Sequence, residues 1–122
     1  KYLFVLNNEP PILGSIIAPD TMSASSQDTL PVHLVVSDPQ GLGDIDSVWF
    51  QSYRPDGTTS GDRFYLLDDG EGADSTSNDG IYSVGIRSYG ASPTGLWTFR
   101  FWARDMQGAL SDSLDHYILI LE

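Results

Sequence analysis

Apolar and polar residues alternate along most of this chain. In the segment 30–37, every second position is apolar, namely Leu30, Val32, Leu34 and Val36. In the segment 96–104, one side carries Trp97, Phe99, Phe101 and Ala103. This alternation indicates β-strands with one face in a core, because successive side chains of a strand point to opposite faces. No long stretch has the i, i+3, i+4, i+7 apolar spacing of a helix.

Clusters of Gly, Pro, Asn, Asp and Ser interrupt the alternation at short intervals, as turns do. Between them the pattern predicts strands at 2–6, 12–18, 30–37, 45–53, 63–67, 81–86, 96–104 and 117–121. The connections leave no room for crossover helices, so neighbouring strands are expected to pair antiparallel. The fold class is therefore all-β, a two-sheet antiparallel sandwich of about seven to eight strands.

The shared parity of the strands also predicts the core between the two sheets. The residues expected to be buried there are Leu34, Val36, Val48, Phe50, Tyr82, Val84, Phe99, Phe101 and Ala103.

The first eleven residues differ from the rest. The apolar strand at 2–6 is followed by Asn7-Asn8-Glu9-Pro10-Pro11, which is typical of a linker. We therefore divide the chain into an N-terminal strand and linker, 1–11, and a sandwich domain, 12–122. The strand could pack on its own domain or add to the sheet of another chain. Because the chain begins without Met or a signal peptide, we expect a mature or excised fragment.

Two turn segments resemble each other, 38–42 (Asp-Pro-Gln-Gly-Leu) and 105–109 (Asp-Met-Gln-Gly-Ala). Each follows a strongly alternating strand, and each places an Asp where its side chain can cap the turn. We interpret them as equivalent turns at one end of the sandwich.

The charge balance changes the picture of possible partners. The 122 residues include 17 acidic and 6 basic ones, for a net charge of −11. This excess argues against binding to nucleic acid or anionic membranes, which require clustered Lys and Arg. It suits solubility and cation binding equally well. The absence of cysteine excludes thiol catalysis, Cys-ligated zinc and disulfides, and no apolar run is long enough to be inserted in a membrane.

Three features carry a resemblance to a known family. They are the segment 35–42 with Ile45, Ser47 and Val48; the segment 95–105 with Gly108 and Ser111; and Leu67-Asp68-Asp69-Gly70, Gly72, Asp74 and Asp79-Gly80-Ile81-Tyr82. Together they are similar to immunoglobulin-like or fibronectin-III-like domains of bacterial surface and secreted proteins, over residues 10–121. The third feature resembles a subset of these domains. The resemblance implies a non-catalytic spacer, adhesive or accessory module. Where many such sandwiches have a corner tyrosine, this chain has Trp97, whose indole N–H could anchor the corner instead.

The segment 68–80 is the candidate metal site. Its acidic and amide oxygens, next to glycines that let a loop turn sharply, suit calcium, which takes six to eight oxygen ligands. The spacing does not match an EF-hand. The candidate ligands are Asp69, Asp74 and Asp79, then Asp68 and Asn78. The alternative is a metal-free connector, in which Asp and Asn cap their own backbone.

An aromatic face is the second candidate site. If the strands 45–53 and 96–104 are neighbours, Trp49, Tyr53 and Trp102 point outward together, between Arg100 and Arg104. Exposed aromatic rings bind sugars or proteins. The alternative is that the arginine stems cover the rings and only stabilise the sheet.

The signals of catalysis are weak. The histidines, His33 and His116, lack the spacing and partners of a zinc site, and no nucleophile motif or phosphate loop is present. We therefore expect a non-enzymatic structural or adhesive module, extracellular, on the cell surface or periplasmic. Its expected partners are neighbouring domains, other surface proteins or glycans. The alternatives are a carbohydrate-binding accessory module and a fibre subunit assembled by strand addition.

Overall fold

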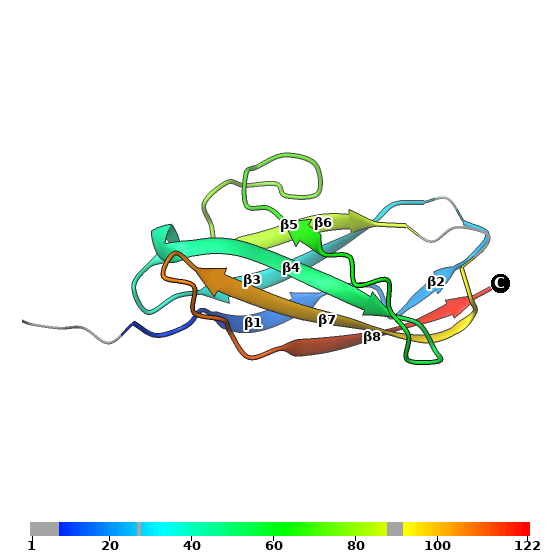
Figure 1. Cartoon of the computed structure of the whole chain (residues 1–122). Helices are drawn as coiled ribbons and strands as arrows, with labels where there is room; N and C mark the ends of the chain where they lie inside the picture. The colour runs from blue at the N-terminus through cyan, green and yellow to red at the C-terminus, as the bar shows by residue number, and fades with distance from the viewer. Residues whose placement is uncertain (1–7, 27, 88–91) are drawn as a thin grey trace, which may run out of the picture.

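The computed structural model describes residues 8–26, 28–87 and 92–122, and it folds them into two packed sheets (Figure 1). The smaller sheet has the order β1-β3-β6, and the larger one has the order β2-β8-β7-β4-β5. The strands are β1 (Ile12–Ile17), β2 (Thr21–Ser23), β3 (Leu30–Ser37), β4 (Ile45–Tyr53), β5 (Phe64–Leu66), β6 (Ile81–Ile86), β7 (Gly95–Asp105) and β8 (Leu114–Leu121). A 3-10 turn, η1 (Leu42–Asp44), precedes β4.

The all-β sandwich predicted from the alternation is confirmed, and the predicted strands from residue 12 onward all form. One strand was missed and one pairing rule was wrong. β2 is too short to show a period of two, and it pairs parallel with β8. The connection between these two parallel strands is formed by the rest of the domain, from β3 to β7, instead of a crossover helix. The predicted strand at 2–6 lies outside the described residues, so the boundary at residue 11 stays a prediction.

Most of the predicted core is confirmed. Seven of the nine residues are buried, namely Leu34, Val36, Val48, Phe50, Phe99, Phe101 and Ala103. Tyr82 and Val84 are only half-buried and pack against the core. The reason is position: they lie on β6, an edge strand of the three-stranded sheet. At the core centre the Phe50 ring lies 5.2 Å from that of Phe99 and 5.3 Å from that of Phe101.

The central pair of the larger sheet is β4 with β7, which run antiparallel over most of their length. In this register Phe50 lies opposite Phe101 and Trp49 lies opposite Trp102. Because side chains alternate, the same pairing sends the phenylalanines into the core and the tryptophans to the outer face. At the far end, Ile45 is paired with Asp105, next to a β-bulge.

Replacement of an aromatic ring at the centre of the core should lower the stability of the fold. Phe101 is 1% exposed, so we expect Phe101→Ala to lower the free energy of unfolding by about 3–5 kcal/mol, as other buried phenylalanines do. On the same strand Leu96 is 53% exposed. Leu96→Ala should therefore change the free energy of unfolding by no more than about 0.5 kcal/mol. Urea denaturation measures both. Equal losses in the two variants would contradict the assignment of the two faces of β7.

Candidate functional site

The acidic loop connects β5 to β6 and extends beyond the sheets (Figure 1). Its base is fixed by an isolated bridge in which Leu67 and Ser83 exchange two backbone hydrogen bonds of 3.0 Å. Asp68 closes the loop just above this bridge. Its carboxylate accepts hydrogen bonds from the backbone N–H of Gly80 at 2.9 Å and of Asp79 at 3.4 Å.

The other aspartates of the loop also accept backbone hydrogen bonds. Asp74 is 4% exposed, and its Oδ2 accepts from the N–H of Gly70 at 2.7 Å. Asp69 and Asp79 each accept from the N–H two residues ahead, that of Glu71 and that of Ile81, both at 3.0 Å. Gly70 is required in this loop, because its φ is +74° and a Cβ there would lie 3.2 Å from the nitrogen of Ser77.

Three of the five candidate ligands come together in the loop. Carboxylate oxygens of Asp68, Asp74 and Asp79 all lie within 4.8 Å of one another. Asp69 lies outside this group, since its carboxylate turns to Glu71. Asn78 has a left-handed backbone with φ 58°, and its backbone N–H donates to the carbonyl of Asp68 at 3.2 Å; its role as a ligand stays a prediction.

The electrostatics of this group follow from its crowding. Burial raises the pKa of Asp68 above its ordinary value, and the neighbouring carboxylate of Asp79 adds to the rise, against the opposing hydrogen bond from Gly80. Burial also raises the pKa of Tyr82, with a further contribution from Asp68. The geometry thus supports two arrangements, a turn held by backbone N–H groups and a cation held by three carboxylates with backbone carbonyls or water.

On the outer face of the larger sheet, Trp49 and Trp102 are neighbours, as predicted. Their rings stack with centroids 6.2 Å apart and an interplanar angle of 26°. Trp49 is nevertheless only 3% exposed, because three side chains cover it. The ring of Tyr65 lies 6.3 Å away, and the guanidinium groups of Arg63 and Arg104 lie 4.5 and 5.5 Å from its centroid. Of the two possibilities for this face, an exposed ring or a ring covered by arginine stems, the structure has the covered one at Trp49.

Tyr53 is also covered by an arginine. The guanidinium of Arg100 lies 4.9 Å from the ring centroid of Tyr53, and it makes a bidentate ion pair with Asp115 at 2.7 and 3.0 Å. Hydrogen bonding to Asp115 raises the pKa of Arg100. Tyr53 and Trp102 remain half-buried, so the outer face is mainly a stabilising layer of stacked rings and arginine stems.

Trp97 has a polar anchor of the kind expected from the resemblance. It lies on the core side of β7 and packs against the buried residues. Its indole N–H donates to the carbonyl of Pro93 at 2.9 Å. This hydrogen bond ties the start of β7 to the segment before it.

The two similar turns lie at the same end of the sandwich, as predicted (Figure 1). Asp38 accepts from the N–H of Gln40 at 2.8 Å, and Asp105 accepts from the N–H of Gln107 at 3.0 Å. Each glycine N–H also donates to the carbonyl of its Asp, at 2.8 Å for Gly41 and 3.0 Å for Gly108. The sequence interpretation did not foresee that these two aspartates also meet Asp44. The Asp-x-Gln-Gly pattern that the two turns share was the feature of the sequence that pointed to their lying together.

No protein-family model and no curated protein sequence matches this chain. Solved structures do match. The PKD domain of an M14-like peptidase from Thermoplasmatales archaeon SCGC AB-540-F20 superposes with a TM-score of 0.58 at 14% identity, over 95% of this chain and 100% of that one. The fold is an immunoglobulin-like β-sandwich.

Two further structures share this immunoglobulin-like sandwich. The fibronectin(III)-like modules of Clostridium thermocellum CbhA match with a TM-score of 0.53 at 19% identity, over 91% of this chain and 46% of that one. A Niemann-Pick type C2 protein from Japanese carpenter ant matches with a TM-score of 0.58 at 12% identity, over 98% of this chain and 99% of that one. At such low identity the likeness concerns the fold alone.

The covered position of Trp49 has a measurable consequence. We expect Trp49→Ala to lower the free energy of unfolding by about 3–5 kcal/mol, because the variant leaves a cavity beneath Tyr65 and the two arginines. Tyr117 is 53% exposed, and Tyr117→Ala should cost no more than about 0.5 kcal/mol. Chemical denaturation tests both variants. If Trp49→Ala lowered the free energy of unfolding no more than Tyr117→Ala does, the covered position of Trp49 would be contradicted. The ring would then lie open to solvent, as in a binding surface.

Proposed function

We propose that this chain is a non-catalytic structural or adhesive module of a bacterial cell-surface or secreted protein, and that calcium stabilises its loop 67–80. The observation that carries the calcium part is the convergence of Asp68, Asp74 and Asp79 within 4.8 Å, on a loop closed at its base. An ion there would neutralise like charges in a small space and rigidify the connection between β5 and β6.

The names of two structural neighbours support the modular part. One is a PKD domain of a peptidase, and the other is a set of fibronectin(III)-like modules of CbhA. Both names describe parts of larger proteins. By analogy, the partners of this chain would be neighbouring domains of the same polypeptide or other surface proteins.

The contacts of the two histidines support a non-enzymatic role. His33 Nδ1 lies 2.7 Å from Ser83 Oγ, which is the spacing of a base and a nucleophile. Ser83 is however only 5% exposed, and its backbone is bridged to Leu67. A substrate could not reach this hydroxyl, so the pair serves as a cross-strand hydrogen bond. His116 Nε2 lies 3.0 Å from the carbonyl of Pro19, where it ties β8 to the segment before β2.

An extracellular or cell-surface location suits both the charge and the proposed ion. Weak calcium sites in extracellular modules, with dissociation constants on the order of 10⁻⁴–10⁻³ M, are filled because calcium outside cells is abundant. Within the described ranges, no helix is long and apolar enough to cross a membrane. A net charge of −11 is also unfavourable for contact with nucleic acid.

Glycan binding through Trp49, Tyr53 and Trp102 is less favoured by the geometry, because arginine and tyrosine side chains cover the Trp49 ring. Assembly into a fibre would depend on the strand predicted at 2–6, which lies outside the described residues.

Calcium should therefore raise the thermal midpoint of unfolding. At 100 times its dissociation constant, an ion that binds only the folded state adds about 2.7 kcal/mol to the free energy of unfolding. We expect a clear upward shift in millimolar calcium chloride, reversed by excess chelator, in a calorimetric or fluorescence melt of the whole chain.

The ligand set is tested by three isosteric variants. Asp74→Asn and Asp79→Asn should each reduce the calcium-dependent shift. Asp69→Asn removes the same charge from the same loop but lies outside the carboxylate group, so it should retain the shift. A wild-type protein whose midpoint and calorimetric titration do not respond to calcium would refute the proposal and leave the loop as a metal-free connector.

A further inference from the structure

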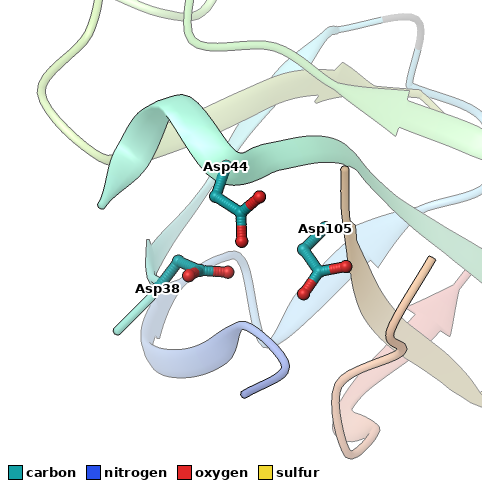
Figure 2. A group of neighbouring side chains, drawn as sticks. All are labelled: Asp38, Asp44 and Asp105. Atoms are coloured by element: carbon teal, nitrogen blue, oxygen red, sulfur yellow. The ribbon is translucent and has the colours of Figure 1, made fainter. Parts of the chain in front are cut away.

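A second group of carboxylates lies at the end of the sandwich where the chain enters it. Asp38 follows β3, Asp44 ends η1, and Asp105 ends β7. Carboxylate oxygens of the three residues lie within 4.8 Å of one another. Figure 2 shows the three carboxyl groups converging on one space between these segments.

Two of these carboxylates are buried, and one of their oxygens has no partner. Asp105 is 1% exposed and Asp38 is 8% exposed. Asp38 Oδ1 caps its own turn at Gln40 N, but its Oδ2 is buried and makes no hydrogen bond. A buried carboxylate oxygen without a donor or a cation is costly. Because the Asp38 carboxyl group is directed toward Asp44 and Asp105 (Figure 2), the missing partner belongs in the space between them.

In the part of the chain that the structure describes, Arg100 is paired with Asp115 and His116 lies 3.8 Å from Asp20, so neither of these basic side chains serves this group. Burial, together with the charges of Asp38 and Asp105, raises the pKa of Asp44. Desolvation acts in the same direction on Asp105, but hydrogen bonds from Asn8 and from the turn's backbone outweigh it and lower the pKa of Asp105.

Two amide side chains complete the surroundings. Asn8 Nδ2 donates to Asp105 Oδ2 at 2.7 Å. The amide of Gln107 faces Asp44 and Asn8, and with its nitrogen toward them it donates to the Asp44 carboxylate at 2.5 and 3.1 Å and to Asn8 Oδ1 at 3.2 Å. With its oxygen toward them, the same amide would present a further ligand to a cation.

We propose that Asp38, Asp44 and Asp105 bind a hard divalent cation, calcium in preference to magnesium, and that the side-chain oxygens of Asn8 and Gln107 contribute to the same site. Every available ligand atom is an oxygen, which selects this class of ion over zinc or copper. Calcium binds oxygens at about 2.3–2.6 Å, so oxygens on opposite sides of the ion are about 4.6–5.2 Å apart. Carboxylate oxygens that all lie within 4.8 Å of one another can therefore contact one ion. Ligands from separate, adjustable segments suit calcium better than the strict octahedron of magnesium.

The position of this site gives it a function separate from the loop 67–80. Asn8 and Glu9 belong to the segment that leads into β1, and Glu9 N–H already donates to Gln40 Oε1 at 3.2 Å. An ion shared by Asn8, the turn after β3 and the turn after β7 would join three segments. It would fix the direction in which the chain enters the sandwich.

The test is calcium titration of the whole chain, followed by nuclear magnetic resonance and calorimetry. The backbone amide signals of Gly41 and Gly108, one in each turn, should shift with calcium chloride and much less with magnesium chloride. Asp44→Asn, an isosteric change at the least buried of the three acids, should weaken calcium binding at this site by at least about tenfold. Asp74→Asn is the matched control and should leave the shifts of Gly41 and Gly108 unchanged.

The two calcium proposals fail separately. If millimolar calcium shifts only Gly70, Gly72 and Gly80 in the folded wild-type protein, the site at Asp38, Asp44 and Asp105 is refuted and the loop site stands. If it shifts only Gly41 and Gly108, the reverse holds. An Asp44→Asn variant that titrates like the wild type at Gly41 and Gly108 would also overturn the inference.

Discussion

The pairing of β4 with β7 is the interaction on which the rest of this structure depends. One register places Phe50 against Phe101 inside and Trp49 against Trp102 outside. The strands are thereby held by packing on both faces of the sheet. The same register brings the start of β4, with Asp44 before it, next to the end of β7 at Asp105. The proximity of Asp44 to Asp105 is thus a direct consequence of how the core is packed.

The aspartates of this chain are organised by the turns rather than scattered over the surface. In both acidic groups, backbone N–H donors hold carboxylates in place while leaving oxygens directed at one another. This arrangement is stable as a set of turns, because most of these aspartates accept hydrogen bonds from the backbone of their own turn or loop. It also gathers negative charge in two small spaces, and a hard cation is the simplest partner that the oxygen chemistry allows. One group stiffens a loop, and the other lies where the chain enters the domain.

The local pattern of the sequence was sufficient for the longer strands from residue 12 onward and for much of the core, because alternation depends only on neighbouring residues. It also placed Trp49 beside Trp102 and matched the turns at Asp38 and Asp105. It left open whether arginine side chains cover Trp49, since this depends on Tyr65 of β5 and on Arg63 just before that strand.

The limits of sequence reasoning at the acidic sites have a similar cause. Asp68 and Asp69 are adjacent, and only the path of the loop decides which one joins Asp74 and Asp79. Asp38, Asp44 and Asp105 come together only when β3, β4 and β7 are assembled, and no local spacing encodes that meeting. The three-residue strand β2 was missed because it is too short to display a period.

The central claim is that the turns of this sandwich bring carboxylates together to bind cations. The most direct test is a crystal structure of the chain grown in millimolar calcium chloride, with anomalous scattering data to identify the ion. The account predicts an ion among Asp68, Asp74 and Asp79, and a second among Asp38, Asp44 and Asp105, each with about six to eight oxygens at about 2.3–2.6 Å. Well-ordered carboxylates with only water between them, in both places, would contradict it.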